Sequence, residues 1–299
     1  MYKILNFGSL NVDYVYNVDH FVQPGETLAS LGSEVFPGGK GLNQSIALAK
    51  AGADVYQAGK IGADGEHLVE LLQDTGVHTE LIDHSGSLTG RAIIQVNRSG
   101  QNCILIDHGA NFEISDEYMD RVFEGFGKND ILVLQNEVNG IDKLIDRAHK
   151  KCMNIAFNPS PIGPEIKKCD FSKITWFLMN EIEGYEITGE TTAEKILDKM
   201  IEFYPKVKII LTIGKNGVMY HEAGFTCSHG TYKVPVVDTT AAGDTFTGFF
   251  ISSIAMGKPV EEALRIASIA SSIAVSRRGA AVSIPVISEV LSSELELGN

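Results

Sequence analysis

The chain has 299 residues, 44 % of them hydrophobic and 21 % charged, so it can bury a full core, and its length alone indicates about two domains. Its formal net charge of -13 disfavours a nucleic-acid partner, which would require a basic face. The most apolar stretches, 246–256 and 263–275, are too short and too interrupted to span a bilayer, so no membrane partner is expected. The cysteines form no CxxC pair, which favours reduced thiols in a cytoplasmic protein.

Short apolar runs alternate with helical patterns along the chain. The runs with the composition of buried strands are 4–7, 55–58, 131–134, 154–157, 175–178 and 209–211. Hydrophobic residues recur at helical spacing over 66–74, 141–150, 192–204, 242–256 and 260–275. This alternation predicts βαβ units, and therefore an α/β fold with a mainly parallel central sheet covered by helices on both faces.

Two segments interrupt the alternation. Residues 12–36 are polar and rich in turns, and residues 91–107 have the pattern of two strands joined by Asn97-Arg98-Ser99-Gly100. We expect these segments to form a small β-sheet lid, because an inserted hairpin must cover its apolar face. No Pro/Ser-rich linker occurs, so residues 1–299 are predicted to form a single domain that carries this lid. The edges and apolar face of such a lid favour a homodimer formed through the lids.

The segment Asp238-Thr-Thr-Ala-Ala-Gly-Asp244 precedes a helical pattern. Residues 239–243 are small, so the segment offers bare backbone N–H groups at a helix N-terminus, where anions bind. Asp244 would lie in the first turn, where a carboxylate is a candidate general base for phosphoryl transfer. The spacing alone leaves a structural role equally open, with Asp244 as a helix cap and Gly243 as a packing residue.

A second glycine-rich segment, Pro37-Gly-Gly-Lys-Gly-Leu-Asn-Gln44, leads into another helix. It is not a Walker A loop, because Lys40 is followed by Gly41, and no GxGxxG motif follows the first strand. Its glycines are explained by a tight turn alone. However, Lys40 and Asn43 beside a bare backbone also make a clamp for a polyhydroxy ligand.

Smaller polar signals follow other predicted strands. Asn180-Glu-Ile-Glu183 opens a helix, and its acids are either ordinary first-turn residues or organise a metal ion through water. Thr212-Ile-Gly214-Lys-Asn-Gly217 and Asn158-Pro-Ser-Pro161 follow two further strands. Open α/β sheets bind ligands at the carboxyl ends of their strands, so these segments together predict a single site.

At these motifs the chain resembles the ribokinase or PfkB family of carbohydrate kinases, over a stretch from Gly8 to about Pro285. The matching motifs, in the family's order, are Asn11-Val-Asp13, Pro24-Gly-Glu-Thr27, Gly38-Gly-Lys-Gly-Leu-Asn-Gln44, Gly109-Ala-Asn111, Leu134-Gln-Asn-Glu137, Asn158-Pro-Ser-Pro161, Asn180-Glu-Ile-Glu183, Thr212-Ile-Gly214, Asp238-Thr-Thr-Ala-Ala-Gly-Asp244 and Arg277-Arg-Gly-Ala280. So many ordered motifs exclude chance similarity and favour the catalytic role of Asp244 over the structural one.

The resemblance implies ATP-dependent phosphorylation of the primary hydroxyl of a small sugar, first of all D-ribose, with Asp244 as the general base. The implied anion hole consists of Ala241, Ala242 and Gly243. The implied sugar ligands are Asn11, Asp13, Gly39, Lys40, Asn43, Glu137 and Asp244. The implied nucleotide site consists of Asn180, Thr212, Gly214, Gly217, Gly243 and Ser268, the last of which stands where the family commonly has Asn. The implied cofactors are Mg²⁺, placed with the help of Glu183, and K⁺ or another monovalent cation, held largely by backbone carbonyls at Asp238, Thr240, Ala274, Arg277, Gly279 and Ser283.

The substrate is less fixed than the chemistry. Thr89-Gly-Arg91 puts a long cation where this family usually carries a small apolar residue on the lid strand. Arg91 either points to solvent or reaches a substrate with an extra polar or anionic group. Another sugar or a nucleoside (fructose, another pentose, a sugar phosphate or a keto sugar acid) therefore stays the alternative acceptor, and a sugar-binding regulator without catalysis stays the remote alternative.

Overall fold

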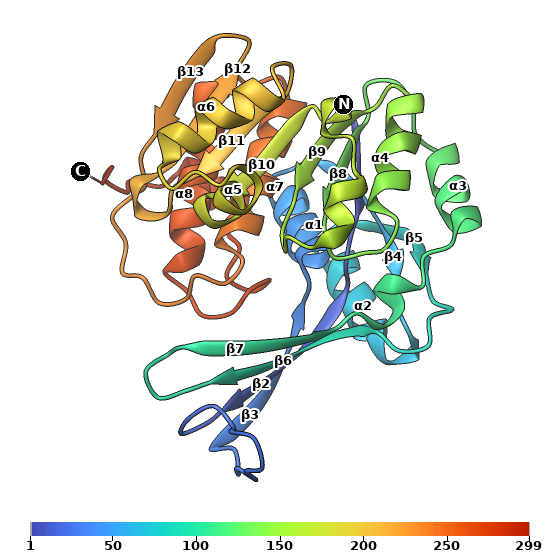
Figure 1. Ribbon diagram of the computed structural model, residues 1–299, viewed down its shortest axis with the longest axis vertical. Coiled ribbons are helices and arrows are strands. Elements are labelled where there is room, and N and C mark those ends of the chain that lie inside the picture. The colour runs from blue at the N-terminus through green and yellow to red at the C-terminus, as the bar shows by residue number, and fades with distance from the viewer. Residues whose placement is uncertain (1, 299) are drawn as a thin grey trace.

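The computed structural model describes residues 2–298 and contains a large sheet flanked by helices and a separate small sheet (Figure 1). The nine strands of the large sheet lie in the order β13 (Phe225–His229), β12 (Val218–Glu222), β11 (Lys208–Thr212), β10 (Trp176–Asn180), β9 (Asn154–Asn158), β8 (Ile131–Gln135), β1 (Lys3–Phe7), β4 (Asp54–Lys60) and β5 (His78–Asp83). Neighbouring strands pair in parallel, except for β12, which pairs antiparallel with β11 and β13. The predicted α/β fold with a mainly parallel sheet is therefore confirmed.

Helices cover both faces of the large sheet (Figure 1). They are α1 (Lys40–Lys50), α2 (Glu66–Asp74), α3 (Asp116–Glu124), α4 (Ile141–Lys150), α5 (Glu181–Thr188), α6 (Ala193–Phe203), α7 (Ala242–Ala255), α8 (Val260–Val275) and α9 (Ile287–Leu291). The short 3₁₀ turns are η1 (Ala63–Gly65), η2 (Gly109–Phe112), η3 (Pro164–Lys168), η4 (Phe171–Lys173) and η5 (Gly214–Asn216). One hydrophobic core packs the sheet against α1, α2, α7, α8 and α9, and a second packs it against α3, α4 and α6. Within residues 2–298, no helix is long and apolar enough to cross a membrane.

The order of the strands reverses at β1. The chain begins at β1, builds β4 and β5 on one side of it, and then returns to place β8 on the other side. The carboxyl ends of β1 and β8 therefore lie at a topological switch point, where open α/β sheets bind their ligands.

The small sheet is formed by the two segments that interrupt the sequence pattern. Its strands lie in the order β3 (Gly32–Gly38), β2 (Asn11–Asn17), β6 (Gly90–Val96) and β7 (Asn102–Asp107), and it extends below the large sheet in Figure 1. Asp13 pairs with Ala92 and Val12 with Arg91, so Asp13 and Ala92 share one face of this sheet while Arg91 lies on the other. All six residues of β7 are exposed. That the small sheet acts as a lid, and that the chain is a single domain, stay predictions.

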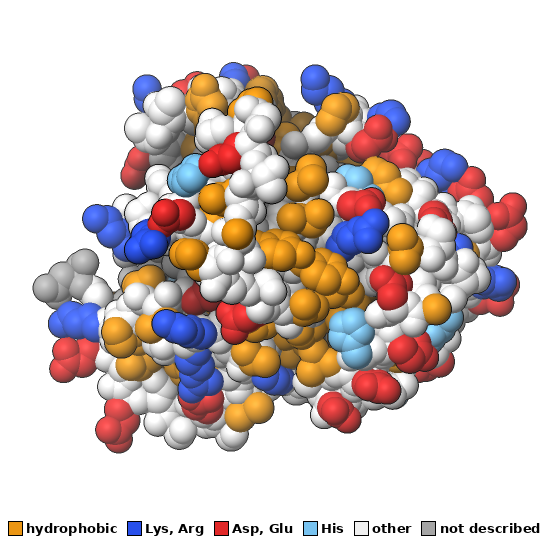
Figure 2. Space-filling view, turned by 90° about the horizontal axis from the view of Figure 1, so that it is seen from below, with side chains coloured by type: hydrophobic (Ala, Val, Ile, Leu, Met, Phe, Trp, Pro, Cys, Tyr) orange, Lys and Arg blue, Asp and Glu red, His pale blue; other side chains and the backbone are white. Residues whose placement is uncertain are grey.

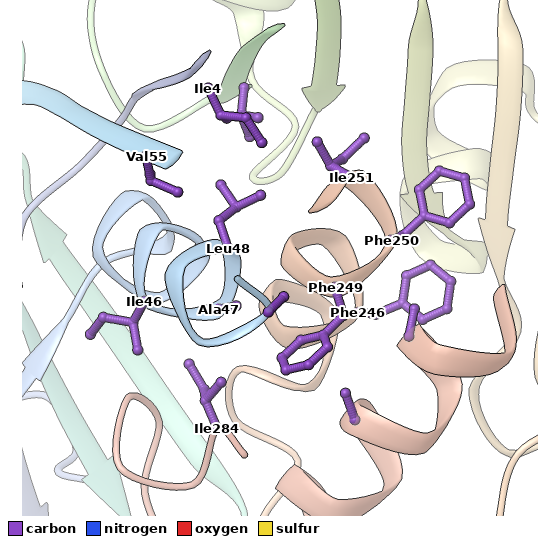
Figure 3. Packing of buried hydrophobic residues seen from close by; sticks show 14 of the residues in the cluster. Ile4, Ile46, Ala47, Leu48, Val55, Phe246, Phe249, Phe250, Ile251 and Ile284 are labelled. Atoms are coloured by element: carbon purple, nitrogen blue, oxygen red, sulfur yellow. The ribbon is translucent and has the colours of Figure 1, made fainter. Parts of the chain in front are cut away.

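Close packing of α1 against α7 brings two distant parts of the chain together (Figure 3). The contact needs a glycine, because a Cβ at Gly248 would lie 2.4 Å from Cβ of Ala47. One helical turn before this contact lie Asp244 on α7 and Asn43 on α1, with Gln44 one residue further along. Residues four apart lie on the same face of a helix, so the close approach points these side chains at one another.

Candidate active site

The N-terminus of α1 is fastened to the ends of β1 and β8. Oε2 of Glu137 accepts the backbone N–H of Lys40 at 3.0 Å and the hydroxyl of Ser9. Oγ of Ser9 accepts the N–H of Gly41 at 3.2 Å. These bonds occupy N–H groups of the first turn of α1, so this helix tip is held by the protein itself. Glu137 is buried, lies two residues past the end of β8 and accepts from the first turn of α1.

At two positions of this segment the backbone geometry favours glycine. A Cβ at Gly41 would lie 2.4 Å from the carbonyl carbon of Gly8, so α1 and the end of β1 approach too closely for any other residue. Gly39 has a φ of 92°, a conformation that glycine adopts readily. The tight-turn interpretation of the cluster is therefore correct. The same turn places Lys40 and Asn43 at the switch point.

The N-terminus of α7, in contrast, is open. Ala241 lies in the left-handed region with a φ of 58° and turns the chain into the helix. The N–H of Ala242 donates to the carbonyl of Thr239 at 3.2 Å, whereas the N–H groups of Gly243 and Asp244 have no hydrogen-bond partner within residues 2–298. Gly243 is exposed, and no atom lies within 4 Å of where its Cβ would be. Bare N–H groups and the helix dipole make this tip a site for an anion.

Asp244 lies in the first turn of α7 and is held by two consecutive residues of α1. Its Oδ2 accepts the amide N–H of Asn43 at 3.1 Å, and its Oδ1 accepts that of Gln44 at 2.9 Å. The carboxylate is 7 % exposed, so it is fixed and still reached from outside. Oδ1 of Asn43 is buried without a hydrogen-bond partner among the described residues.

A cavity of about 210 Å³ opens over this helix tip. Its lining comes from the ends of several strands and from the start of α7: Lys40, Asn158, Ser160, Leu178, Met179, Asn180, Glu183, Thr212, Thr239, Ala241, Gly243, Asp244, Phe246 and Thr247. Burial lowers the pKa of Lys40, but the nearby carboxylates of Asp244, Glu137 and Glu183 more than offset this, so its pKa is raised overall. The cavity thus combines a permanent cation, a carboxylate and an open helix tip.

Asn11 and Asp13 reach the switch point from the small sheet. Oδ1 of Asn11 accepts the amide of Asn111 at 2.7 Å, which leaves the N–H groups of Asn11 available as donors. Burial and the nearby charge of Glu137 raise the pKa of Asp13 to about 7. A carboxylate with such a pKa changes its charge within the physiological range.

The predicted nucleotide residues divide into two groups. Asn180 and Thr212 line the cavity, whereas Gly214, Gly217 and Ser268 do not. Gly217 has a φ of 97°, and its Cβ would lie 2.0 Å from the carbonyl oxygen of His229, so the turn between β11 and β12 itself explains this glycine. Ser268 is buried within α8.

Glu183, the predicted Mg²⁺ residue, forms a capping box with Asn180. Its two carboxylate oxygens accept the backbone N–H of Asn180 at 2.9 Å and the amide of the same residue at 3.0 Å. Both oxygens keep further lone pairs at the wall of the cavity, so Glu183 fits a water-mediated contact to an ion. Within residues 2–298, no three His, Cys, Asp or Glu side chains cluster as a metal site.

The residues predicted to hold a monovalent cation lie on two loops that Asp238 connects, except for Ala274, which lies in the last turn of α8. Its Oδ1 accepts the N–H of Thr240 at 2.9 Å and its Oδ2 that of Gly279 at 3.0 Å, and these bonds, which oppose the effect of partial burial, lower the pKa of Asp238. The carbonyl of Ala274 accepts the N–H of Arg277 at 3.1 Å, and the hydroxyl of Ser283 donates to the carbonyl of Ala280 at 2.8 Å. Carbonyl and carboxylate oxygens are the ligands that a hard monovalent cation takes, so the donor set fits the expectation.

Arg91 takes no part in this site. On the face of the small sheet opposite Asp13, it donates to Oδ2 of its cross-strand partner Asp107 from Nε at 3.0 Å and from Nη2 at 2.9 Å. This pairing supports the alternative in which Arg91 does not reach the substrate, and that alternative stays a prediction. The small residue that faces the same way as Asp13 is Ala92.

Sequence reasoning missed several residues of the site. Gln44 follows the expected Asn43 directly, and its contact with Asp244 depends on the crossing of α1 and α7. Thr239, Ser160 and Thr247 line the cavity and stand inside or beside motifs that were recognised. Their position inside or beside those motifs was the sequence signal that could have identified them.

Comparison with known proteins places the chain in one family. A model of the pfkB family carbohydrate kinases matches residues 1–287. The ribokinase of Bacillus subtilis is 33 % identical over 297 residues, which cover 97 % of this chain and 98 % of that protein. The ribokinase of Thermotoga maritima has a structure with a TM-score of 0.86 and 34 % identity, over 97 % of this chain and 98 % of that one. A structure of Arabidopsis thaliana ribokinase complexed with ribose and ATP has a TM-score of 0.86 and 28 % identity, over 97 % of both chains.

The chain belongs to the pfkB family of carbohydrate kinases. It is an ATP-dependent sugar kinase, as the resemblance of its motifs implied.

Proposed function

We propose that this enzyme transfers the γ-phosphoryl group of ATP to the primary hydroxyl of D-ribose, giving ADP and ribose 5-phosphate, with Asp244 as the general base. The observation that carries the mechanism is the position of Asp244, in the first turn of α7 beside an open helix tip and at the wall of a cavity. The choice of ribose is supported by the relatives named ribokinases, which match this chain over nearly its whole length.

In the proposed reaction the acceptor hydroxyl lies against Asp244 and the γ-phosphate against the N–H groups of Gly243 and Asp244. The hydroxyl oxygen forms a bond to the γ-phosphorus while the bond from that phosphorus to the bridging oxygen of ADP breaks, and the hydroxyl proton passes to Asp244. The open N–H groups and Lys40 stabilise the charge on the transferred group. Ala241 and Ala242 complete the proposed anion hole by shaping the turn that exposes these groups.

The sugar would lie between α1 and the small sheet. Asn43 offers a buried acceptor atom without a partner among the described residues, and Asn11 offers free donors, which suits a ligand that has both kinds of group on each hydroxyl. Asp13, Gly39, Lys40 and Glu137 lie around the same switch point and complete the proposed sugar site. Closure of the small sheet over the sugar would keep water away from the phosphoryl group.

The nucleotide would extend from the helix tip along Asn180 and Thr212 toward Gly214, Gly217 and Ser268. Mg²⁺, placed with Glu183 through water, would neutralise phosphate charge, and Glu183 itself holds the start of α5 toward the cavity. A monovalent cation at Asp238, Thr240, Ala274, Arg277, Gly279 and Ser283 would stiffen the loop that forms the open tip. Such a cation could activate the enzyme without touching the substrate.

Two alternatives differ from this proposal in the acceptor alone or in the chemistry. The position of Arg91 on the face opposite Asp13, paired with Asp107, gives no support to a sugar phosphate or a keto sugar acid. Fructose, another pentose or a nucleoside keeps the same chemistry with a different acceptor. A non-catalytic sugar-binding regulator would not need a base beside an open helix tip.

A sugar panel tests the proposal most efficiently. ADP release would be followed in a coupled assay with ribose, 2-deoxyribose, arabinose, fructose and adenosine, each with and without K⁺, at fixed Mg²⁺ and ATP. We expect the highest kcat/KM for ribose and a clear increase with K⁺. Faster turnover of another acceptor would replace ribose, and no ADP with any acceptor would favour the regulator.

We also propose that the small sheets of two copies pack together to form a homodimer. Apolar residues on both faces of this sheet are exposed, among them Val35, Ile104 and Leu105, which are 57 %, 51 % and 65 % exposed. Figure 2 shows the molecule from the side on which the small sheet lies in Figure 1, and hydrophobic side chains gather on this side of the molecule. Monomers of soluble proteins rarely expose large apolar patches, so a covering partner is expected. Sedimentation velocity should give a dimer for the wild type and a monomer for Leu105→Glu, whereas a monomeric wild type would contradict the proposal.

A further inference from the structure

A connected group of buried polar side chains leads from the middle of the large sheet to Asp244. Its members are Asn6 on β1, Gln44 and Ser45 on α1, Gln57 on β4 and Gln135 on β8, and all of them are 0 % exposed. Completely buried amides are costly unless they are hydrogen-bonded, so such a group requires a reason beyond packing.

The part of the group next to the carboxylate consists of two glutamines. Nε2 of Gln135 donates to Oε1 of Gln44 at 2.7 Å, and Nε2 of Gln44 donates to Oδ1 of Asp244 at 2.9 Å. Nε2 of Gln135 also donates to Oδ1 of Asn6 at 2.9 Å. Gln135 is the last residue of β8, and Glu137 follows two residues later and holds the start of α1, so α1 is fixed to the end of this strand at two points.

The direction of these hydrogen bonds is set by the carboxylate. Ionised Asp244 can only accept, so Gln44 must turn its N–H groups toward it and its carbonyl oxygen toward Gln135. Gln135 must then donate, which it does to both Gln44 and Asn6. If Gln44 turned over to accept a proton from Asp244, its amide N–H groups would face those of Gln135. Gln135 could turn over in response, since its Oε1 has no hydrogen-bond partner among the described residues, but that oxygen would then face Oδ1 of Asn6, acceptor against acceptor.

We propose that Gln44, oriented by Gln135, is a positioning residue that keeps the carboxylate of Asp244 turned toward the acceptor hydroxyl. The inference rests on the proposed role of Asp244 as the base. A carboxylate oxygen is held in place by the donor that it accepts from, and here Gln135 fixes the orientation of that donor in turn. The charge of Lys40 on α1 also acts on Asp244, as it does on Glu137 and Glu183.

The far part of the group provides a matched control. Gln57 donates to the carbonyls of Gly8 and Ala58 at 3.1 and 2.8 Å and does not contact Asp244. It is as deeply buried as Gln44, so Gln57→Met removes an equivalent buried amide with no direct effect on the base. Gln44→Met keeps the length of the side chain and removes its hydrogen bonds.

The test is the steady-state kinetics of the wild type, Gln44→Met, Gln135→Met and Gln57→Met with ribose and ATP, with thermal unfolding of each. Loss of one hydrogen bond to a charged group should lower kcat of Gln44→Met about 10- to 100-fold. KM for ATP should stay within about twofold. Gln135→Met should lower kcat by less, and Gln57→Met should lower only the melting temperature.

A kcat of Gln44→Met that matches those of the wild type and Gln57→Met would overturn the inference. If Gln44→Met does not fold, kcat of Gln135→Met decides in the same way. Neither result would touch the proposed function, which fails only if the wild type releases no ADP or if Asp244→Asn keeps its activity.

Discussion

Two carboxylates of the site, Asp244 and Asp13, are held in contrasting ways. Asp244 lies in the packed core, where amides from two consecutive residues of α1 take one oxygen each. Asp13 lies on the small sheet, half-buried, where burial and the nearby Glu137 raise its pKa to about 7. The two parts of the site therefore differ in role. The packed part around α1 and α7, the core region, fixes Asp244, which is proposed for chemistry. The small sheet, the recognition region, carries Asp13, which is proposed for sugar binding and whose charge depends on its surroundings.

Lys40 should show the largest effect, since it lies close to the group proposed for chemistry. The carboxylates of Asp244, Glu137 and Glu183 are nearby, and Lys40 lines the cavity over α7. Lys40→Met should lower kcat/KM about 100- to 1,000-fold, the usual cost of removing one group that stabilises a transition-state charge. Steady-state kinetics would measure this. An effect confined to KM for the sugar would assign Lys40 to sugar binding and not to phosphoryl transfer.

The core region depends on the contact of α1 with α7. Gly248→Leu would place a large side chain where even a Cβ would lie 2.4 Å from Ala47, and it should force the two helices apart. Overpacking of this kind typically costs about 1–3 kcal/mol of unfolding free energy. Urea unfolding would measure the loss, and kcat should fall with it because Asn43 and Gln44 move away from Asp244. If kcat stays unchanged although the variant is destabilised, the packing of α1 against α7 stabilises the fold without positioning Asp244.

The recognition region should respond to pH. The folded-state pKa of Asp13 is raised, so the protonated form is favoured in the folded protein, and its contribution to stability is lost as pH rises through about 7. Ionised Asp13 accepts hydrogen bonds from sugar hydroxyls, so KM for ribose should fall about tenfold between pH 6 and pH 8. Asp13→Asn should give a KM with little pH dependence. The same slope in that variant would assign the titration to another group.

The smallest effect is expected at Arg91, on the face of the small sheet opposite Asp13. Arg91 pairs with Asp107, and exposed pairs contribute about 0–1 kcal/mol. Arg91→Ala should leave KM for ribose within about twofold. A large rise in KM would show that both faces of the small sheet take part in recognition.

The sequence allowed the core region to be predicted better than the small sheet. The helices expected at 66–74, 141–150 and 260–275 agree with the structure at both ends, because their hydrophobic periodicity is set by burial on one face. The strand β5 and the helix α3 were not predicted: β5 is a polar edge strand, and α3 carries five charged residues out of nine. The antiparallel hairpin β12–β13 at the other edge was missed as well.

For the site, the sequence identified Asp244, Lys40 and Asn43 through local motifs. It did not identify Gln44 and Gln135, which lie 91 positions apart and meet only because α1 crosses the end of β8. The face on which Arg91 lies also depends on the register of β6 against β2, which the hairpin pattern alone does not set.

The most direct measurement is ribose phosphorylation by Asp244→Asn in comparison with the wild type, with ATP binding followed by calorimetry. The amide keeps the shape of the side chain and removes the base, so kcat should fall at least about 100-fold while the Kd for ATP stays within about threefold. Activity near the wild-type level in this variant would contradict the central role given to Asp244.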